Sequence, residues 1–150
     1  MTTLKIAIPN KGRLSEKIYD LLDRSGLKFP SKDERSLTVC TKDNKYSIIF
    51  VRTQDIPRFV EMNVADVGFT GFDIVSELKS NVDIIMDLDF GRCDMVVAVK
   101  EEDDYNCSKD LPQNIKVATS FPNIAKEYFE KLGKKPQIIE VSGATEITPR

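Results

Sequence analysis

The sequence predicts an α/β protein with mainly parallel sheets. Short runs rich in β-branched and aromatic residues alternate with segments in which apolar residues recur at helical spacing. The chain has 150 residues, of which 41% are hydrophobic and 31% charged, a balance typical of a folded globular protein. A chain of this length forms one ordinary domain or two small lobes.

The first strand is expected at residues 4–9, where apolar residues lead to a proline and a polar turn. A helix follows, because Leu14, Ile18 and Leu22 recur at helical spacing until Gly26 interrupts the pattern. This order is that of a strand–turn–helix unit.

A hairpin is expected next, because the β-rich runs 37–41 and 46–52 are separated by a short polar turn. A short helix should follow over residues 56–62. Asp55 is placed to cap this helix, and Pro57 lies in its first turn, where proline is tolerated.

The rest of the chain continues the alternation. Strands are expected at residues 64–69, 82–88, 95–99, 115–119 and 137–141. Helices are expected at residues 72–78 and 123–132. The break around Phe90 and Gly91 is the best candidate for a change of lobe, and the polar stretch 103–113 predicts a connection.

Charge and hydropathy exclude several classes of partner. The formal net charge is −2 and no block of like charge occurs, so nothing favours a nucleic acid or a membrane surface. No apolar run is long enough to span a bilayer, and the N-terminus carries no export signal. A cytoplasmic protein is therefore expected.

The sequence contains no histidine and three widely spaced cysteines, Cys40, Cys93 and Cys107. The missing histidine excludes imidazole-based triads and His-ligated zinc. The cysteines form no C-x-x-C pair, which argues against a disulfide framework or a thiolate metal site. By residue type, Cys93 is a packing residue, because a nucleophilic thiolate would need a base.

Four loops that follow expected strands have the character of anion sites, because ligands of open α/β sheets bind beyond the carboxyl ends of strands. In the first loop, Gly12 permits close backbone approach, and Lys11 and Arg13 supply cations for phosphate. A solvated turn with ordinary surface charges is the competing interpretation.

The second and third loops are similar in kind. Arg52 ends a strand and is suited to a two-pronged contact with phosphate, whereas Asp55 fits a cap better than a ligand contact. Gly71 exposes backbone amides and Thr70 adds a hydroxyl, while Asp73 is a ligand contact or a first-turn acid.

The fourth loop consists of small, hydroxylated and acidic residues after the last strand. These residues are Ser142, Gly143, Ala144, Thr145 and Glu146. Such a segment makes a plausible nest for phosphate, and a purely structural loop is an equal alternative. Together the four loops favour an anion site more strongly than any one of them.

Taken in order, these segments resemble the ATP phosphoribosyltransferases. The matches are the Lys-Gly-Arg-Leu turn at 11–14, V-R-x-x-D-I-P at 51–57, D-x-G-x-x-G at 66–71, L-D-F-G-x-C at 88–93, A-T-S-F/Y-P at 118–122 and G-S-V-E-V/I-A/T-P-R at 143–150. In the last match, Ala144 and Thr145 stand where the family tends to have Ser and Val. The glycine-rich D-x-x-x-T-G-x-T-L loop, which in the family holds the 5-phosphate of phosphoribosyl pyrophosphate, is absent from the sequence.

The resemblance implies a fold of two α/β lobes like those of type II periplasmic binding proteins, with the active site in the cleft. The first lobe would cover residues 1–88 and the second residues 89–150. The second lobe is expected to be truncated before the chain returns to the first.

The resemblance also implies an activity, in which adenine N1 of ATP attacks C1 of phosphoribosyl pyrophosphate in the first step of histidine biosynthesis. The catalytic candidates are Arg52 for the pyrophosphate, and Lys11 and Arg13 for phosphates of either substrate. The substrate-lining candidates are Gly12, Thr70, Gly71, Asp73, Cys93 and Ser142 through Glu146.

Mg²⁺ would be carried by the pyrophosphate, with no dedicated protein metal site. The compact connection between Leu78 and Val82 favours the short form of the family. That form is a homo- and hetero-oligomer with a regulatory subunit resembling histidyl-tRNA synthetase. The alternative is a non-enzymatic, two-lobed binding protein for a nucleotide or another phosphorylated anion.

Overall fold

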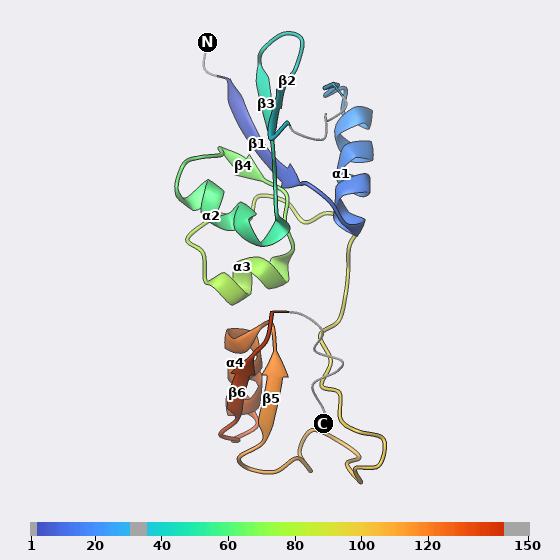
Figure 1. Ribbon diagram of the computed structural model, residues 1–150, viewed down its shortest axis with the longest axis vertical. Coiled ribbons are helices and arrows are strands. Elements are labelled where there is room, and N and C mark those ends of the chain that lie inside the picture. The colour runs from blue at the N-terminus through green and yellow to red at the C-terminus, as the bar shows by residue number, and fades with distance from the viewer. Residues whose placement is uncertain (1–2, 31–35, 143–150) are drawn as a thin grey trace. The chain divides into compact units, whose positions relative to one another are not determined.

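A computed structural model describes residues 3–30 and 36–142 and confirms an α/β protein with mainly parallel strands (Figure 1). The chain divides into two compact units, Met1–Arg92 and Cys93–Arg150, close to the expected boundary after Leu88. Whether these units are the two lobes of a binding-protein-like fold stays a prediction. In the described ranges, no helix has the length and apolar character needed to cross a membrane.

The first unit is built on a four-stranded sheet in the order β2-β3-β1-β4. Its central strand, β1 (Leu4–Pro9), pairs in parallel with β3 (Tyr46–Val51) and with β4 (Val67–Gly68). The short strand β2 (Thr38–Cys40) pairs antiparallel with β3, which confirms the predicted hairpin. The three parallel strands therefore end at the same edge.

Helix α1 (Arg13–Arg24) covers one face of this sheet. Its apolar stripe buries Ile18 and Leu22 against alternate residues of β1 and against β3. The buried members of this core are Ile6, Ile8, Ile18, Leu22, Ile48 and Phe50. The spacing of two along the strands and of four along the helix explains why the sequence pattern predicted both elements.

The opposite face of the sheet carries helix α2 (Ile56–Glu61), which follows the 3₁₀ turn η1 (Thr53–Asp55). Ala7 of β1, Ile56 and Ala65 form its buried core. Asp55 precedes α2 as expected, but its side chain makes no capping hydrogen bond. The cap prediction is wrong because η1 already holds Asp55 in a helical backbone conformation, with φ −92° and ψ −17°.

The second unit contains a parallel pair of strands joined by a helix. Strand β5 (Lys116–Thr119) leads into α4 (Pro122–Lys131), and the chain returns in parallel as β6 (Gln137–Glu140). Ala125 and Phe129 of α4 are buried, and Pro122 begins the helix, as its fixed φ favours.

A buried lysine fastens the connection that precedes β5. The Nζ atom of Lys134 donates hydrogen bonds to the carbonyls of Lys109, at 2.9 Å, and of Leu111. Asp110 accepts hydrogen bonds from the backbone N–H groups of Cys107 and Asn106, and these bonds hold the pKa of its carboxyl below the ordinary value.

Three predicted strands differ from the structure. Residues 82–88 and 95–99 form no strand, and only Val67–Gly68 of the run 64–69 pairs in a ladder. A strand requires hydrogen bonds to a neighbouring backbone, and within 3–30 and 36–142 no segment pairs with the first two runs. Their apolar side chains are accordingly exposed, for example Ile85 at 79% and Val96 at 76%.

Gly68 marks the place where α2 approaches β4 most closely. A Cβ atom at this position would overlap Cγ2 of Ile56 and lie 3.1 Å from Cγ2 of Val60. Ile56 is fully buried. The glycine is therefore required by packing and not by its backbone conformation.

Replacing Gly68 by alanine should lower the free energy of unfolding by about 1–3 kcal/mol, because the added methyl group overpacks this contact. Chemical denaturation measures the loss. In the double variant Gly68→Ala/Ile56→Ala the overlapping Cγ2 is gone, so the two losses should sum to more than the loss of the pair. Strictly additive losses would contradict the proposed overlap.

Candidate functional site

The carboxyl edge of the first sheet brings together loops that lie far apart in the sequence. Beyond the ladder, the N–H of Asn10 donates to the carbonyl of Val51 at 2.8 Å, and the N–H of Phe69 donates to that of Ala7 at 3.0 Å. These bonds hold the loops after β1, β3 and β4 side by side. The predicted site residues at this edge are Lys11, Gly12, Arg13, Arg52, Thr70, Gly71 and Asp73.

The first loop turns sharply into α1 at Gly12. This residue has φ +100°, a conformation that residues with side chains rarely adopt, and a Cβ placed there would meet nothing within 4 Å. The buried side chain of Ser15 folds back, and its Oγ donates to the carbonyl of Gly12 at 2.6 Å. The turn is thus fixed from inside while its outer side stays open to a ligand.

Lys11, Arg13 and Arg52 are exposed cations. Among the residues that the structure describes, none of the three has a carboxylate oxygen within 4.0 Å. Unpaired cations beside the N-terminus of α1 favour the binding of an anion with several oxygens. The edge formed by β3 and β1 is therefore electropositive.

The third loop differs in charge, because Asp73 occupies the start of helix α3 (Phe72–Leu78). Its Oδ1 accepts the N–H of Ile74 at 2.9 Å and lies directly over Gly71, where a Cβ would overlap it. The carboxylate therefore sits where an anion would otherwise bind. The β4 side of the edge suits hydroxyl or amino groups better than phosphate.

Thr70 does not point freely into solvent. Its Oγ1 donates a hydrogen bond to the carbonyl of Thr53 at 3.0 Å, which joins the third loop to the turn that follows Arg52. Sequence reasoning missed Thr53, because its contribution is a backbone carbonyl rather than a side chain. The available signal was its place inside the V-R-x-x-D-I-P segment.

The predicted residues of the second unit are placed only in part. Cys93 and Ser142 are exposed, and Gly143, Ala144, Thr145 and Glu146 lie outside the described residues. The carboxyl ends of β5 and β6 are joined by Ser120, whose Oγ donates to the carbonyl of Val141 at 2.8 Å. The role of these loops in a shared site stays a prediction.

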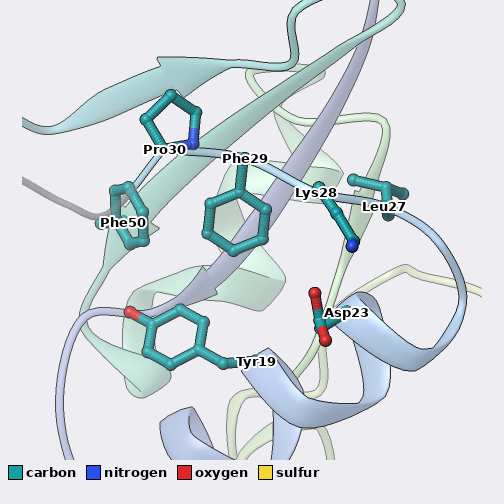
Figure 2. A pocket seen from close by; sticks show the side chains of 7 residues that line it. All are labelled: Tyr19, Asp23, Leu27, Lys28, Phe29, Pro30 and Phe50. Carbon is teal, nitrogen blue, oxygen red and sulfur yellow. The ribbon is translucent and has the colours of Figure 1, made fainter.

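A recess of about 450 Å³ lies on the α1 side of the first unit, apart from the predicted site residues. Figure 2 shows the rings of Tyr19, Phe29 and Phe50 along it, with Asp23 and Lys28 beside them. The ring centroids are 6.0–6.3 Å apart in tilted pairs, so the rings mainly pack against one another. Partial burial raises the pKa of the Tyr19 hydroxyl.

The segment that matches L-D-F-G-x-C runs along α1. The Nζ atom of Lys17 lies 5.9 Å from the centroid of the Phe90 ring, and a Cβ on Gly91 would lie 2.6 Å from Cδ2 of Leu14. Gly91 also has φ +76°. This segment therefore packs beside α1, which begins directly after Gly12.

Acidic and sulfur ligands are not gathered anywhere in the described residues. No group of three or more Cys, Asp or Glu side chains lies where it could hold a metal ion, and the sequence has no histidine. The carboxyl edge instead presents cations and backbone N–H groups.

The sequence and the fold match known proteins over nearly the whole chain. A family profile described as ATP phosphoribosyltransferase (HisG) matches residues 52–150. The ATP phosphoribosyltransferase of Methanocaldococcus jannaschii is 46% identical over 148 residues, which are 97% of this chain and 51% of that protein. That of Methanopyrus kandleri is 47% identical over 147 residues, which are 98% of this chain and 52% of that protein.

The fold of the chain also resembles that of a solved structure. The ATP phosphoribosyl transferase (HisG:HisZ) complex from Thermotoga maritima contains a chain with a TM-score of 0.70 and 29% identity. The match covers 98% of this chain and 68% of that one. The chain thus spans about half the length of the curated relatives it matches.

The raised pKa of Tyr19 makes a prediction for alkaline solution. Because the folded-state pKa lies above the unfolded value of 10.0, ionisation opposes the folded state. The contribution of the neutral hydroxyl is complete below pH 10.0 and is lost as pH rises through the folded pKa. The variant Tyr19→Phe should lose less stability above pH 10 than the parent when denaturant midpoints are compared. Equal losses would contradict the burial of this hydroxyl.

Proposed function

The chain belongs to the ATP phosphoribosyltransferase family, and we propose that the protein joins ATP to phosphoribosyl pyrophosphate in the first step of histidine biosynthesis. In this reaction adenine N1 attacks C1 of the phosphoribosyl group, a C–N bond forms, and the bond from C1 to the pyrophosphate oxygen breaks. The products are phosphoribosyl-ATP and pyrophosphate.

The observation that carries the proposal is a set of cations at one sheet edge, none of which pairs with a carboxylate of the described residues. Lys11, Arg13 and Arg52 come from two loops that the Asn10–Val51 hydrogen bond joins. A departing pyrophosphate concentrates negative charge, and fixed cations near it stabilise that charge without rearranging during the reaction. We assign Arg52 to the pyrophosphate, and Lys11 and Arg13 to phosphates of either substrate.

The absence of histidine fits this chemistry. The attacking ring nitrogen of adenine has an available lone pair, so no side chain needs to remove a proton before the attack. The barrier lies in bringing N1 to C1 and in stabilising a cation-like ribosyl centre and the leaving group. Positioning and electrostatics address both.

The negative charge of Asp73 at the third loop would orient a bound substrate. Asp73 accepts from its own backbone through Oδ1, as described, and its carboxylate favours hydroxyl or amino groups over phosphate. We propose that the nucleoside side of a substrate faces Asp73 and Gly71, while phosphates face Arg52 and Lys11. The roles of Gly12 and Cys93 as lining residues belong to the same proposal.

Mg²⁺ is proposed to enter with the pyrophosphate. This ion commonly keeps several waters and binds through substrate phosphates with few protein ligands. The cations and backbone N–H groups at the carboxyl edge would bind phosphate oxygens, and the metal would be held by the substrate. When bound, the ion would neutralise part of the charge on the leaving group.

The larger assembly is also a proposal. The likeness to the Thermotoga maritima chain supports two lobes of the type II periplasmic-binding class. It also supports a regulatory partner, since that structure is a HisG:HisZ complex. The curated relatives are about twice as long as this chain, which leaves room for a regulatory domain of their own. Co-purification of the protein with a subunit resembling histidyl-tRNA synthetase separates these arrangements.

The decisive experiment is a product assay with ATP, phosphoribosyl pyrophosphate and Mg²⁺. It compares this chain with a protein extended to the length of the relatives, with and without the candidate regulatory subunit. Phosphoribosyl-ATP from the extended protein supports the proposal, and we expect little or none from the chain alone. No product from any combination would overturn the transferase assignment.

Removing the Arg52 guanidinium should weaken pyrophosphate binding to this chain roughly 10- to 100-fold, the usual worth of a charge-assisted contact. Isothermal titration with pyrophosphate compares Arg52→Ala with Arg24→Ala, whose exposed side chain pairs with Asp20 at the far end of α1. The control should bind like the parent. If both variants bind within a few-fold of the parent, Arg52 does not hold the pyrophosphate.

A further inference from the structure

The segment Asp66–Gly71, which matches D-x-G-x-x-G, contacts other parts of the first unit through Asp66, Gly68 and Thr70. Asp66 fastens β4 to β1, because its Oδ2 accepts the N–H of Lys5 at 2.7 Å and its own N–H donates to the Lys5 carbonyl at 2.9 Å. Gly68 packs closely against Ile56 and Val60 of α2. The segment is therefore anchored at its start and packed in its middle.

Thr70 makes the third contact, and it reaches the turn beside Arg52. The carbonyl of Thr53 accepts the Thr70 hydroxyl at 3.0 Å and also the backbone N–H of Ile56 at the end of η1. Two donors on one carbonyl fix the orientation of the peptide group that follows Thr53. Both residues are partly buried, which shields the bond from competing water.

From these contacts we infer that Thr70 is a positioning residue for Arg52. Its hydroxyl holds the η1 turn, through Thr53, in the orientation that directs the preceding arginine toward the carboxyl edge. Gly68 lets Ile56, the residue that follows η1, pack closely against β4. The inference rests on the proposed role of Arg52 and reassigns Thr70, whose proton is committed to Thr53, from ligand contact to support.

The substitution Thr70→Val tests this inference, because valine keeps the shape and removes the hydroxyl. The Thr53 carbonyl keeps its bond from Ile56, so no acceptor is orphaned and the fold should persist. Pyrophosphate affinity of the chain should fall about 3- to 10-fold, the usual range for one lost hydrogen bond. Thr70→Ser, which retains the hydroxyl, should restore it to within about twofold of the parent.

A matched control is Thr41→Val. Thr41 is buried, and its hydroxyl bonds within the β2–β3 turn, at the opposite end of β3 from Arg52. Its removal should disturb the hairpin and leave pyrophosphate affinity unchanged. A loss of affinity in both variants would mean that general loosening of the unit, and not the Thr53 contact, causes the effect.

Two further measurements distinguish a positioning role of Thr70 from a direct contact between Thr70 and the ligand. In ligand-free protein, the amide NMR signals of Arg52, Thr53 and Gln54 should shift in Thr70→Val, which loss of a ligand contact alone would not cause. In the double variant Arg52→Ala/Thr70→Val, affinity should equal that of Arg52→Ala, because Thr70 acts through Arg52. The titration is made at low ionic strength, where weakened binding stays measurable.

The outcomes distinguish this inference from the proposed function. If Arg52→Ala weakens binding but Thr70→Val adds an independent loss, Thr70 contacts the anion directly and the inference is overturned. If Arg52→Ala has no effect, the assignment of Arg52 fails, and with it the basis of the inference. In the extended enzyme, the expected signature of Thr70→Val is a raised KM for phosphoribosyl pyrophosphate with little change in the KM for ATP.

Discussion

The parallel pairing of β1 with both β3 and β4 is the constraint on which the candidate site depends. β1 is the central strand, and its register with β3 is fixed over all six of its residues, from Leu4 opposite Tyr46 to Pro9 opposite Val51. Parallel strands place their carboxyl ends at one edge, so three loops separated in sequence converge there. A slip by one residue would turn Ile6 and Ile8 away from α1 and Ala7 away from α2, so the two cores hold the edge in place.

The charged groups at that edge are separated by sign. The loops after β1 and β3 supply cations that no carboxylate in 3–30 or 36–142 pairs with, whereas the loop after β4 supplies a carboxylate that already accepts a backbone N–H. In the proposed function, the phosphates of a substrate face the cations and its hydroxyl groups face this carboxylate. The order of the strands, β3-β1-β4, would then set the direction of binding.

Local periodicity predicted most of the elements, including β1, whose partners are distant in sequence, and it failed for two runs that pair with no described segment. The helix at Phe72–Leu78 and the β2–β3 hairpin follow from spacing and turn residues alone. The runs 82–88 and 95–99 have strand-like composition, but composition does not specify a partner, and they form no ladder. At the site, the cations were predictable from residue type. The bond from Thr70 to Thr53 was not, because it arises only when two loops are folded together.

The strand order also bears on how the chain is made. β1 leaves the ribosome before both of its neighbours, and β4 ends only at Gly68. At synthesis rates of about 5–20 residues per second, the N-terminal strand waits roughly 3 to 13 s for its second neighbour. During that interval the core of Ile6 and Ile8 lacks the contacts of Val67 and Phe69. The hydrogen bond from Thr70 to Thr53 can form only after β4 has docked on β1.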